Sequence, residues 1–218
     1  MVKGIIFDVD GTLFNSMSVW MDAGKLYLES FGCEVHENIG EIMFDMTMAQ
    51  AAKYMQDNYS IKLSVQEICQ GINNRVYDFY ANEAEPKEGV LQFLDYVYQK
   101  NIPMTIATST DRPMIEAALK RVGFDKYIKK IFTTTEIGKG KDSPDIFKAA
   151  MKEMDSTEET TWLFEDALYS IDTAGKMGIK TVGIYDFSSA SQQDEIRKKA
   201  DIYIKDWSEY KSVIEKMF

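Results

Sequence analysis

The sequence has few of the residues that several common kinds of site require. It holds two cysteines and one histidine in 218 residues. Cys33 and Cys69 do not form a C-x-x-C pair, so the sequence indicates neither a disulfide framework nor a zinc site. A lone histidine such as His36 is usually solvated, which excludes Ser-His-Asp and Cys-His catalysis unless it lies in a pocket. We therefore expect a reducing compartment and chemistry based on other side chains.

Basic residues and long apolar runs are also scarce. Lysine and arginine number 25 against 35 acidic residues, which gives a formal net charge of -10. Because nucleic-acid binding requires clustered positive charge, and no basic stripe occurs, we expect no nucleic-acid partner. No apolar run approaches the ~18 residues of a membrane span, and the opening residues do not resemble a signal peptide. These features predict a cytoplasmic protein that does not cross a membrane.

The stretch Gly4 to Ser16, GIIFDVDGTLFNS, places two carboxylates directly after a short apolar run. Such a run predicts a strand that is covered on both faces, as in a parallel sheet. Asp8 then lies at the carboxyl end of the strand, where α/β sheets bind ligands. Asp10 lies so close to Asp8 that a cation is needed to keep both carboxyl groups ionised, and a hard divalent metal is the obvious candidate. An isolated D-x-D-G is more often a surface turn, so the other motifs must decide.

The periodicity of the apolar residues divides the chain into two regions. Residues 17–82 show helical spacing throughout, including a helix that begins with Ser64 as amino cap and Glu67 three residues later. Residues 83–218 alternate between helix and strand. We therefore predict an α/β fold with a doubly wound, Rossmann-like parallel sheet, formed by residues 1–16 and 83–218, and a small all-helical domain at 17–82 inserted after the first strand.

Two further stretches carry groups that can bind an anion. The strand at 103–108 ends in Thr108 and Ser109 before a helix begins, a geometry that suits a phosphate, although an ordinary helix cap is the common alternative. The second stretch is GKGKDSPDIF at 138–147, which offers Lys139 and Lys141 as point charges for phosphoryl oxygens. It does not fit a P-loop, which needs Ser or Thr after the lysine.

A further strand, at 161–164, ends in adjacent acidic residues, Glu165 and Asp166. Taken alone, such a pair is usually a solvated loop. In a parallel sheet, however, the carboxyl ends of neighbouring strands meet at one edge, so this pair and Asp8 are expected at the same crevice.

Taken together and in this order, DVDGTLF at 8–14, the Thr108 strand end, the lysine stretch and the Glu-Asp pair resemble the four motifs of the haloacid dehalogenase superfamily. The resemblance implies a nucleophile at Asp8 and a general acid and base at Asp10. It also implies phosphate binding by Thr108, Ser109 and Lys141, which lies three residues before Pro144 as the family's lysine does. Asp142 departs from the family pattern, which usually has proline there.

The resemblance further implies Mg²⁺ as cofactor, held by Asp8, Glu165, Asp166 and the backbone carbonyl of Asp10. In the Glu-Asp form of the motif Asp172 is not required, so we expect it to be an exposed helix residue.

The helical domain resembles the family's small cap. Its candidate specificity residues are Trp20, Met21 and Lys25, whereas the apolar group Met43, Phe44, Met46 and Met48 is expected to form cap core or closure surface rather than a pocket wall.

The implied function is Mg²⁺-dependent hydrolysis of a small phosphorylated metabolite, such as a sugar phosphate, through an aspartyl phosphate, by a monomer or weak homodimer. Three alternatives remain open. One is phosphoryl transfer like that of β-phosphoglucomutase, which shares the four motifs. Another is a response-regulator receiver module, which also combines an acidic metal pair with a phosphorylated aspartate, but lacks a helical insertion and a D-x-D motif. The third is a non-catalytic relative retained for binding, although all the expected catalytic residue types are present.

Overall fold

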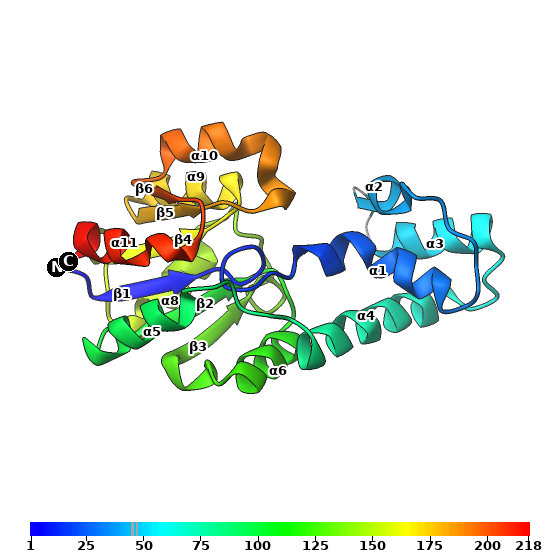
Figure 1. Cartoon of the computed structure of the whole chain (residues 1–218), viewed down its shortest axis with the longest axis horizontal. Coiled ribbons are helices and arrows are strands. Elements are labelled where there is room, and N and C mark those ends of the chain that lie inside the picture. The colour runs from blue at the N-terminus through cyan, green and yellow to red at the C-terminus, as the bar shows by residue number, and fades with distance from the viewer. Residues whose placement is uncertain (45, 47) are drawn as a thin grey trace. The chain divides into compact units, whose positions relative to one another are not determined.

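The computed structural model describes all residues except Asp45 and Thr47, and the side chains of Glu41 and Phe44 also lie outside its described part. The chain divides into two compact units. The α/β unit comprises residues 1–15 and 84–218, and the helical unit comprises residues 16–83. The helical unit is therefore an insertion between the first strand and the rest of the α/β unit (Figure 1).

A six-stranded parallel sheet forms the centre of the α/β unit (Figure 1). Its order is β3-β2-β1-β4-β5-β6, so the direction in which strands are added reverses between β1 and β4. This topology confirms the predicted doubly wound fold. The strands are β1 (Gly4–Phe7), β2 (Met104–Thr108), β3 (Ile128–Thr133), β4 (Thr161–Glu165), β5 (Lys180–Ile184) and β6 (Ile202–Ile204).

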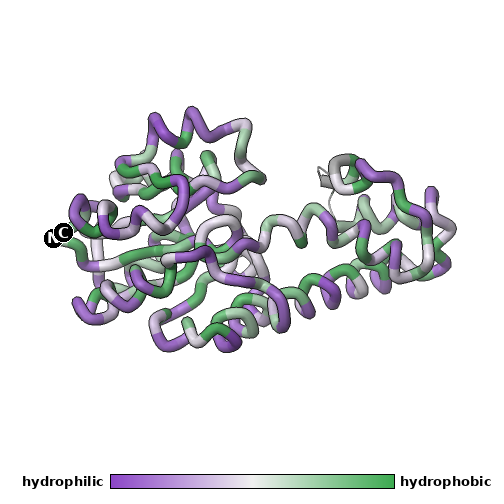
Figure 2. Tube along the Cα trace, viewed as in Figure 1, coloured by the Kyte–Doolittle hydropathy of each residue, from purple (hydrophilic) through white to green (hydrophobic). Residues whose placement is uncertain are grey.

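The central strands consist of apolar runs because both of their faces are covered. All residues of β1, β2 and β4 are buried, and their side chains alternate between two layers of helices. Ile6 and Leu163 contact residues of α8 (Asp145–Met154) and α9 (Leu168–Met177) on one face. The hydropathy colouring shows these apolar segments inside the unit and polar ones outside (Figure 2).

An aromatic cluster covers the opposite face. Phe7 and Phe164 pack there against Phe93 of α5 (Val90–Gln99) and against Trp207, whose ring stacks on that of Phe164 at a centroid distance of 5.3 Å. Offset and edge contacts of this kind add to the stabilisation from burial. The remaining helices of this unit are α6 (Arg112–Val122), α7 (Thr134–Ile137), α10 (Gln193–Lys199) and α11 (Tyr210–Met217), with short 3₁₀ turns η1 (Asp125–Tyr127), η2 (Glu158–Thr160), η3 (Phe187–Gln192) and η4 (Trp207–Glu209).

The helical unit contains α1 (Met17–Glu29), α2 (Ile39–Phe44), α3 (Met48–Tyr59) and α4 (Val65–Asn82). The predicted start of α4 is confirmed: Ser64 accepts a hydrogen bond from the amide of Glu67, whose carboxylate accepts one from the amide of Ser64. Phe31 lies beyond the end of α1 and is 49% exposed.

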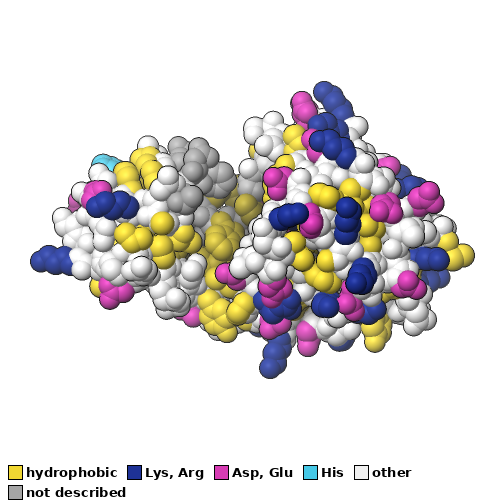
Figure 3. Space-filling model, turned by 180° about the vertical axis from the view of Figure 1, so that it is seen from behind, with side chains coloured by type: hydrophobic (Ala, Val, Ile, Leu, Met, Phe, Trp, Pro, Cys, Tyr) yellow, Lys and Arg dark blue, Asp and Glu magenta, His cyan; other side chains and the backbone are white. Residues whose placement is uncertain are grey.

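The surface of the α/β unit carries charge of both signs. Figure 3 shows acidic and basic side chains interspersed over one of its faces. Within the part of the chain that is described, no helix combines the length and the apolar character needed to span a membrane.

Candidate active site

The candidate site lies where the strand order reverses. Asp8 directly follows β1, Thr108 is the last residue of β2, and Glu165 is the last residue of β4. β1 pairs with both β2 and β4, and the amide of Asp8 donates to the carbonyl of Phe164 at 2.9 Å. The carboxyl ends of these three strands therefore meet at one edge, the usual ligand position in an open α/β sheet.

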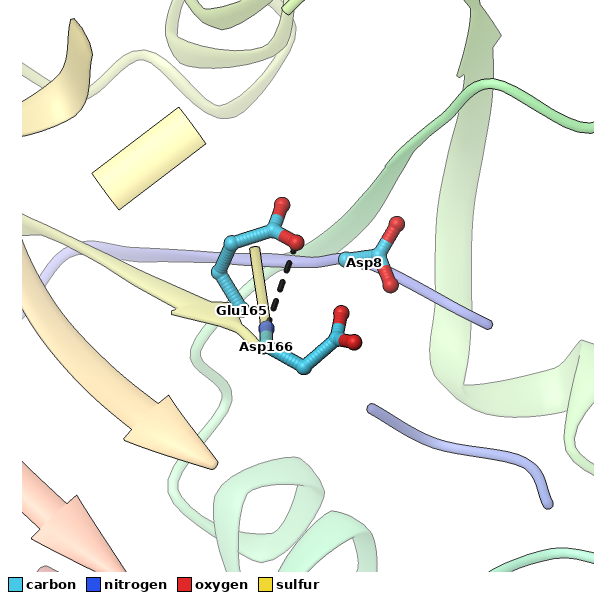
Figure 4. A group of neighbouring side chains, drawn as sticks. All are labelled: Asp8, Glu165 and Asp166. Carbon is cyan, nitrogen blue, oxygen red and sulfur yellow. Dashed lines mark hydrogen bonds between the residues drawn. The ribbon is translucent and has the colours of Figure 1, made fainter. Parts of the chain in front are cut away.

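Three buried carboxyl groups converge at this edge. Asp8, Glu165 and Asp166 each offer an oxygen that lies within 4.8 Å of the others, and we call them the carboxylate cluster. Figure 4 shows their side chains extending from the ends of β1 and β4 into a common space. The Nζ of Lys141 donates to Asp8 Oδ1 at 2.6 Å and to Glu165 Oε2 at 2.8 Å. One ammonium group thus contacts two members of a three-carboxylate cluster.

The two lysines of the GKGKDSPDIF stretch have different environments. Lys141 is only 3% exposed and reaches the carboxylate cluster, as described above. Lys139 is exposed and pairs instead with Asp145 at 3.1 Å. Asp142, which replaces the family's usual proline, lies exposed in a turn that the amide of Ser143 closes onto the carbonyl of Gly140. The departure from the family pattern therefore leaves Lys141 beside Asp8.

Local hydrogen bonds fix the orientation of the Glu165 side chain. Its Oε1 accepts from the backbone amides of Asp166, at 3.2 Å, and Ala167, at 3.1 Å. Its Oε2 accepts from the hydroxyl of Ser170 at 2.7 Å as well as from Lys141. Ser170 was not anticipated from the sequence, because a serine in the first turn of a helix is too common to signal a role.

The side chain of Asp10 is also held in place. The hydroxyl of Thr110 donates to Asp10 Oδ2 at 2.6 Å, and the amide of Thr110 donates to the hydroxyl of Thr108 at 3.0 Å. Thr108 is fully buried, whereas Ser109 is exposed and lies near the Tyr169 side chain. Sequence reasoning named Thr108 and Ser109 but not Thr110, although it belongs to the same Thr-Ser-Thr run.

A tight turn at Gly11 separates Asp10 from the rest of the loop. Gly11 has a φ of +80°, which side-chain-bearing residues rarely adopt. A Cβ at this position would lie 2.5 Å from Asp166 Oδ2, so the backbone approaches that carboxylate more closely than another residue permits. The hydroxyl of Thr12 donates to Asp166 Oδ1 at 3.4 Å, and Trp207 Nε1 donates to the carbonyl of Thr12 at 2.9 Å. The glycine therefore brings the loop into contact with the carboxylate cluster.

Burial and mutual repulsion shift the acid–base equilibria of the cluster. Burial first, and then the charge of Glu165, raise the pKa of Asp8 to about 8 against the opposing effect of Lys141. Burial and the charges of Glu165 and Asp8 likewise raise the pKa of Asp166 well above its usual range. Burial lowers the pKa of Lys141, but attraction to Asp8 and Glu165 outweighs it and leaves that pKa well above its usual range. One lysine thus does not balance the negative charge.

The carboxylate cluster has the donor set of a hard divalent cation. All of its ligand atoms are carboxylate oxygens, the type that Mg²⁺ and Ca²⁺ prefer. Asp8 Oδ2 is buried and has no hydrogen-bond partner, one of two such side-chain atoms among the described residues. A buried carboxylate oxygen without a partner is costly unless a ligand satisfies it. The cluster could therefore hold a divalent metal, with Asp8, Glu165 and Asp166 as its ligands.

Asp172 lies outside this site, on α9 (Leu168–Met177). It is half-buried rather than exposed, and it forms an ion pair with Lys199 at 2.8 Å. The expectation of an exposed residue was wrong because α10 (Gln193–Lys199) packs beside α9 and supplies a cation. No described contact joins Asp172 to the carboxylate cluster.

The helical unit contains a cavity of about 210 Å³. Trp20 and Met21 line it, whereas Lys25 is not among its lining residues. Met43, Met46 and Met48 line it too, and Met43 is also buried in the core of this unit, as expected, whereas the Phe44 side chain lies outside the described residues. The other lining residues are Ala23, Gly24, Gly40, Ala51, Met55 and Ile72.

Comparison with known proteins agrees with the fold and the motifs. The model of the haloacid dehalogenase-like hydrolase family matches residues 5–184. A phosphorylated carbohydrates phosphatase of Thermotoga maritima is 22% identical over 83% of this chain and 84% of its own length. Validoxylamine A 7'-phosphate phosphatase of Streptomyces hygroscopicus is 25% identical over 96% of both chains.

A solved structure shares the fold across nearly the whole chain. CbbY from Rhodobacter sphaeroides, solved in complex with phosphate, superposes with a TM-score of 0.77 at 21% identity and covers 96% of each chain. Since the family model matches most of the sequence, including the strands that carry Asp8, Thr108 and Glu165, the chain belongs to the haloacid dehalogenase-like hydrolases.

Proposed function

We propose that this protein is a Mg²⁺-dependent phosphatase that hydrolyses a small phosphorylated metabolite, such as a sugar phosphate, through an aspartyl phosphate, with the helical unit as its cap domain. The observation that carries the proposal is the contact of Lys141 with both Asp8 and Glu165 beside an unpartnered oxygen of Asp8. The names of the two phosphatase relatives support the substrate class.

The proposed reaction has two steps. A carboxylate oxygen of Asp8 attacks phosphorus, the bond to the alcohol oxygen breaks, and Asp10 gives the departing alcohol a proton. Asp10 then accepts a proton from a water molecule, which attacks the aspartyl phosphate and releases inorganic phosphate. The hydrogen bond from Thr110 supports this role for Asp10 because it restricts the carboxyl group to one orientation.

The remaining groups handle the charge of the phosphoryl oxygens. Lys141 contributes a fixed positive charge next to Asp8, and Thr108 and Ser109 at the end of β2 are proposed to bind the phosphate. Asp8, Glu165, Asp166 and the backbone carbonyl of Asp10 would hold Mg²⁺, which would neutralise negative charge on the phosphoryl group. In a buried site such charges interact more strongly than in water.

A phosphate-release screen tests this function. Sugar phosphates, nucleotides and small phosphoesters are incubated with the protein and Mg²⁺, with and without chelator, and inorganic phosphate is measured. We expect release from at least one class, lost on chelation and unchanged in Asp194→Asn, which removes an exposed aspartate. Release that is insensitive to chelation, or none from folded protein, contradicts the proposal. Transfer that requires a sugar bisphosphate, with little free phosphate, would indicate a mutase instead.

Mg²⁺ is expected to raise the melting temperature of the metal-free protein, more at pH 8 than at pH 5. Because burial, then Glu165, raise the pKa of Asp8 to about 8, the folded metal-free protein keeps a proton that the unfolded chain has lost by pH 5. Stability from this group is therefore lost as the pH rises toward 8. Mg²⁺ must displace the same proton, so its affinity rises over that range.

Calorimetry and thermal unfolding measure this effect. At a Mg²⁺ concentration about 100-fold above its Kd, binding stabilises the folded protein by about 2.7 kcal/mol. For a chain of this size, this raises the melting temperature by roughly 5 to 10 °C. Titrations at pH 6 in two buffers with different protonation enthalpies should reveal proton release. Asp166→Asn should lose most of the gain while Asp194→Asn keeps it. A melting temperature that saturating Mg²⁺ leaves unchanged would count against the metal site.

A further inference from the structure

A second buried ion pair lies in the α/β unit beside the carboxylate cluster. Lys87 Nζ donates to Asp186 Oδ2 at 3.0 Å and to the backbone carbonyl of Tyr185 at 2.9 Å. The two side chains are 11% and 5% exposed. Neither residue belongs to the motifs discussed above, and they are far apart in the sequence. Buried pairs of this kind are costly to desolvate, so their presence calls for a reason.

Lys87 connects the loop after β1 to the end of β5. Its backbone amide donates to the carbonyl of Leu13 at 2.8 Å, and the preceding Pro86 forms a bridge with Phe14. Its side chain reaches Tyr185 and Asp186, which follow β5 directly. The lysine therefore ties the loop that carries Asp10 and Gly11 to the sheet on the far side of β4.

Asp186 borders the same space as Asp166. A Cβ on Gly11 would lie 2.5 Å from Asp166 Oδ2 and 3.1 Å from Asp186 Cγ, so the turn at Gly11 lies close to both carboxyl groups. The other oxygen of Asp186, Oδ1, accepts from the amide of Ser188 at 3.0 Å and from its hydroxyl at 2.8 Å. These bonds hold the carboxylate of Asp186 in a fixed orientation next to the Gly11 turn.

We propose that Lys87 and Asp186 are positioning residues of the carboxylate cluster: they hold the Gly11 turn against Asp166 and form a neutral pair that sets the charge around the metal site. The inference rests on the proposed function, since it concerns the affinity of that site for Mg²⁺. A carboxylate next to Asp166 attracts a cation and an ammonium group repels it, and the two effects offset each other in the intact pair. Removal of the Asp186 charge alone should therefore lower Mg²⁺ affinity, and removal of the Lys87 charge alone should raise it.

The test measures Mg²⁺ binding by calorimetry and by the Mg²⁺-induced rise in melting temperature. Asp186→Asn leaves the lysine charge unbalanced and should weaken Mg²⁺ binding by about tenfold or more. Lys87→Met leaves the carboxylate unbalanced and should strengthen Mg²⁺ binding, whereas kcat should fall because the Gly11 turn is no longer held to the end of β5. The double variant Lys87→Met/Asp186→Asn is neutral again and should bind Mg²⁺ within a few-fold of the starting protein.

A matched ion pair and a conservative variant complete the design. Lys199→Met and Asp172→Asn break a pair in the same unit outside the carboxylate cluster and should leave Mg²⁺ affinity unchanged. Lys87→Arg keeps the charge and should bind Mg²⁺ normally, which provides a folded comparison if Lys87→Met does not fold.

The outcomes separate this inference from the proposed function. Equal weakening of Mg²⁺ binding in both single variants without recovery in the double variant indicates mere structural damage and overturns the inference. Unchanged binding in all variants overturns it too, while phosphate release by the starting protein would keep the proposed function intact. A starting protein that binds no Mg²⁺ overturns both.

Discussion

Replacing Asp8 with asparagine is expected to reduce phosphate release by ~10³-fold or more, because an amide cannot form the aspartyl phosphate on which both steps depend. Asparagine has nearly the same size and keeps a carbonyl oxygen that can accept from Lys141. The change therefore removes the nucleophile with little change in packing. Single-turnover phosphate release on the best substrate of the screen measures the effect.

Stability measurements test whether Asp8→Asn loses phosphate release only because it unfolds. Since burial and the charge of Glu165 disfavour the ionised form of Asp8, metal-free Asp8→Asn should be at least as stable at pH 7 as the starting protein. It should also gain less from Mg²⁺. Full activity in Asp8→Asn would refute the nucleophile assignment, and loss of activity in Asp194→Asn would show that the assay responds to changes outside the site.

Replacing Lys141 with methionine is expected to damage both stability and catalysis. Lys141 is the ammonium group that contacts Asp8 and Glu165, and removal of one partner from a buried ion pair costs about 3 to 5 kcal/mol. For a chain of this length we expect the melting temperature of the metal-free protein to fall by roughly 10 °C. Loss of the positive charge next to phosphorus should lower kcat by ~10²- to 10³-fold.

Mg²⁺ provides the internal check on this explanation. If the loss of stability in Lys141→Met comes from unbalanced carboxylates, saturating Mg²⁺ should restore much of it, because the cation neutralises the same groups. Lys148→Met, which removes an exposed lysine on α8, serves as the control and should change neither property. A Lys141→Met protein that retains full stability without metal would argue against charge compensation as the role of this lysine.

The sequence was sufficient to predict the sheet core and most helices because local signals and tertiary environment agree there. Buried parallel strands require apolar runs, and Ser64 and Asp111 stand at helix starts. The start of β3 is hard to predict from the sequence because Lys129 and Lys130 on this edge strand are exposed and interrupt the apolar run. The short helices α2 and α7 span too few residues to show a period.

The site was predictable where its residues end a strand or directly follow one, and Lys141 was predicted from the resemblance of its stretch to the family's lysine motif. Asp8, Thr108, Glu165 and Asp166 share that position, so their convergence follows from a parallel sheet. Thr110 and Ser170 act through hydrogen bonds whose geometry depends on the folded loops. Lys87 and Asp186 are 99 residues apart and neither follows a distinctive motif, so only the fold brings them together.

The junction between the two units suggests how such a chain can diversify. Where the polypeptide leaves the α/β unit and returns to it, Phe14 bridges Pro86 and the amide of Asn15 donates to the carbonyl of Glu85 at 2.9 Å. These contacts hold the outgoing and returning segments side by side within the α/β unit. The helical unit can therefore be lengthened, shortened or exchanged in evolution while the α/β unit that carries the carboxylate cluster stays intact.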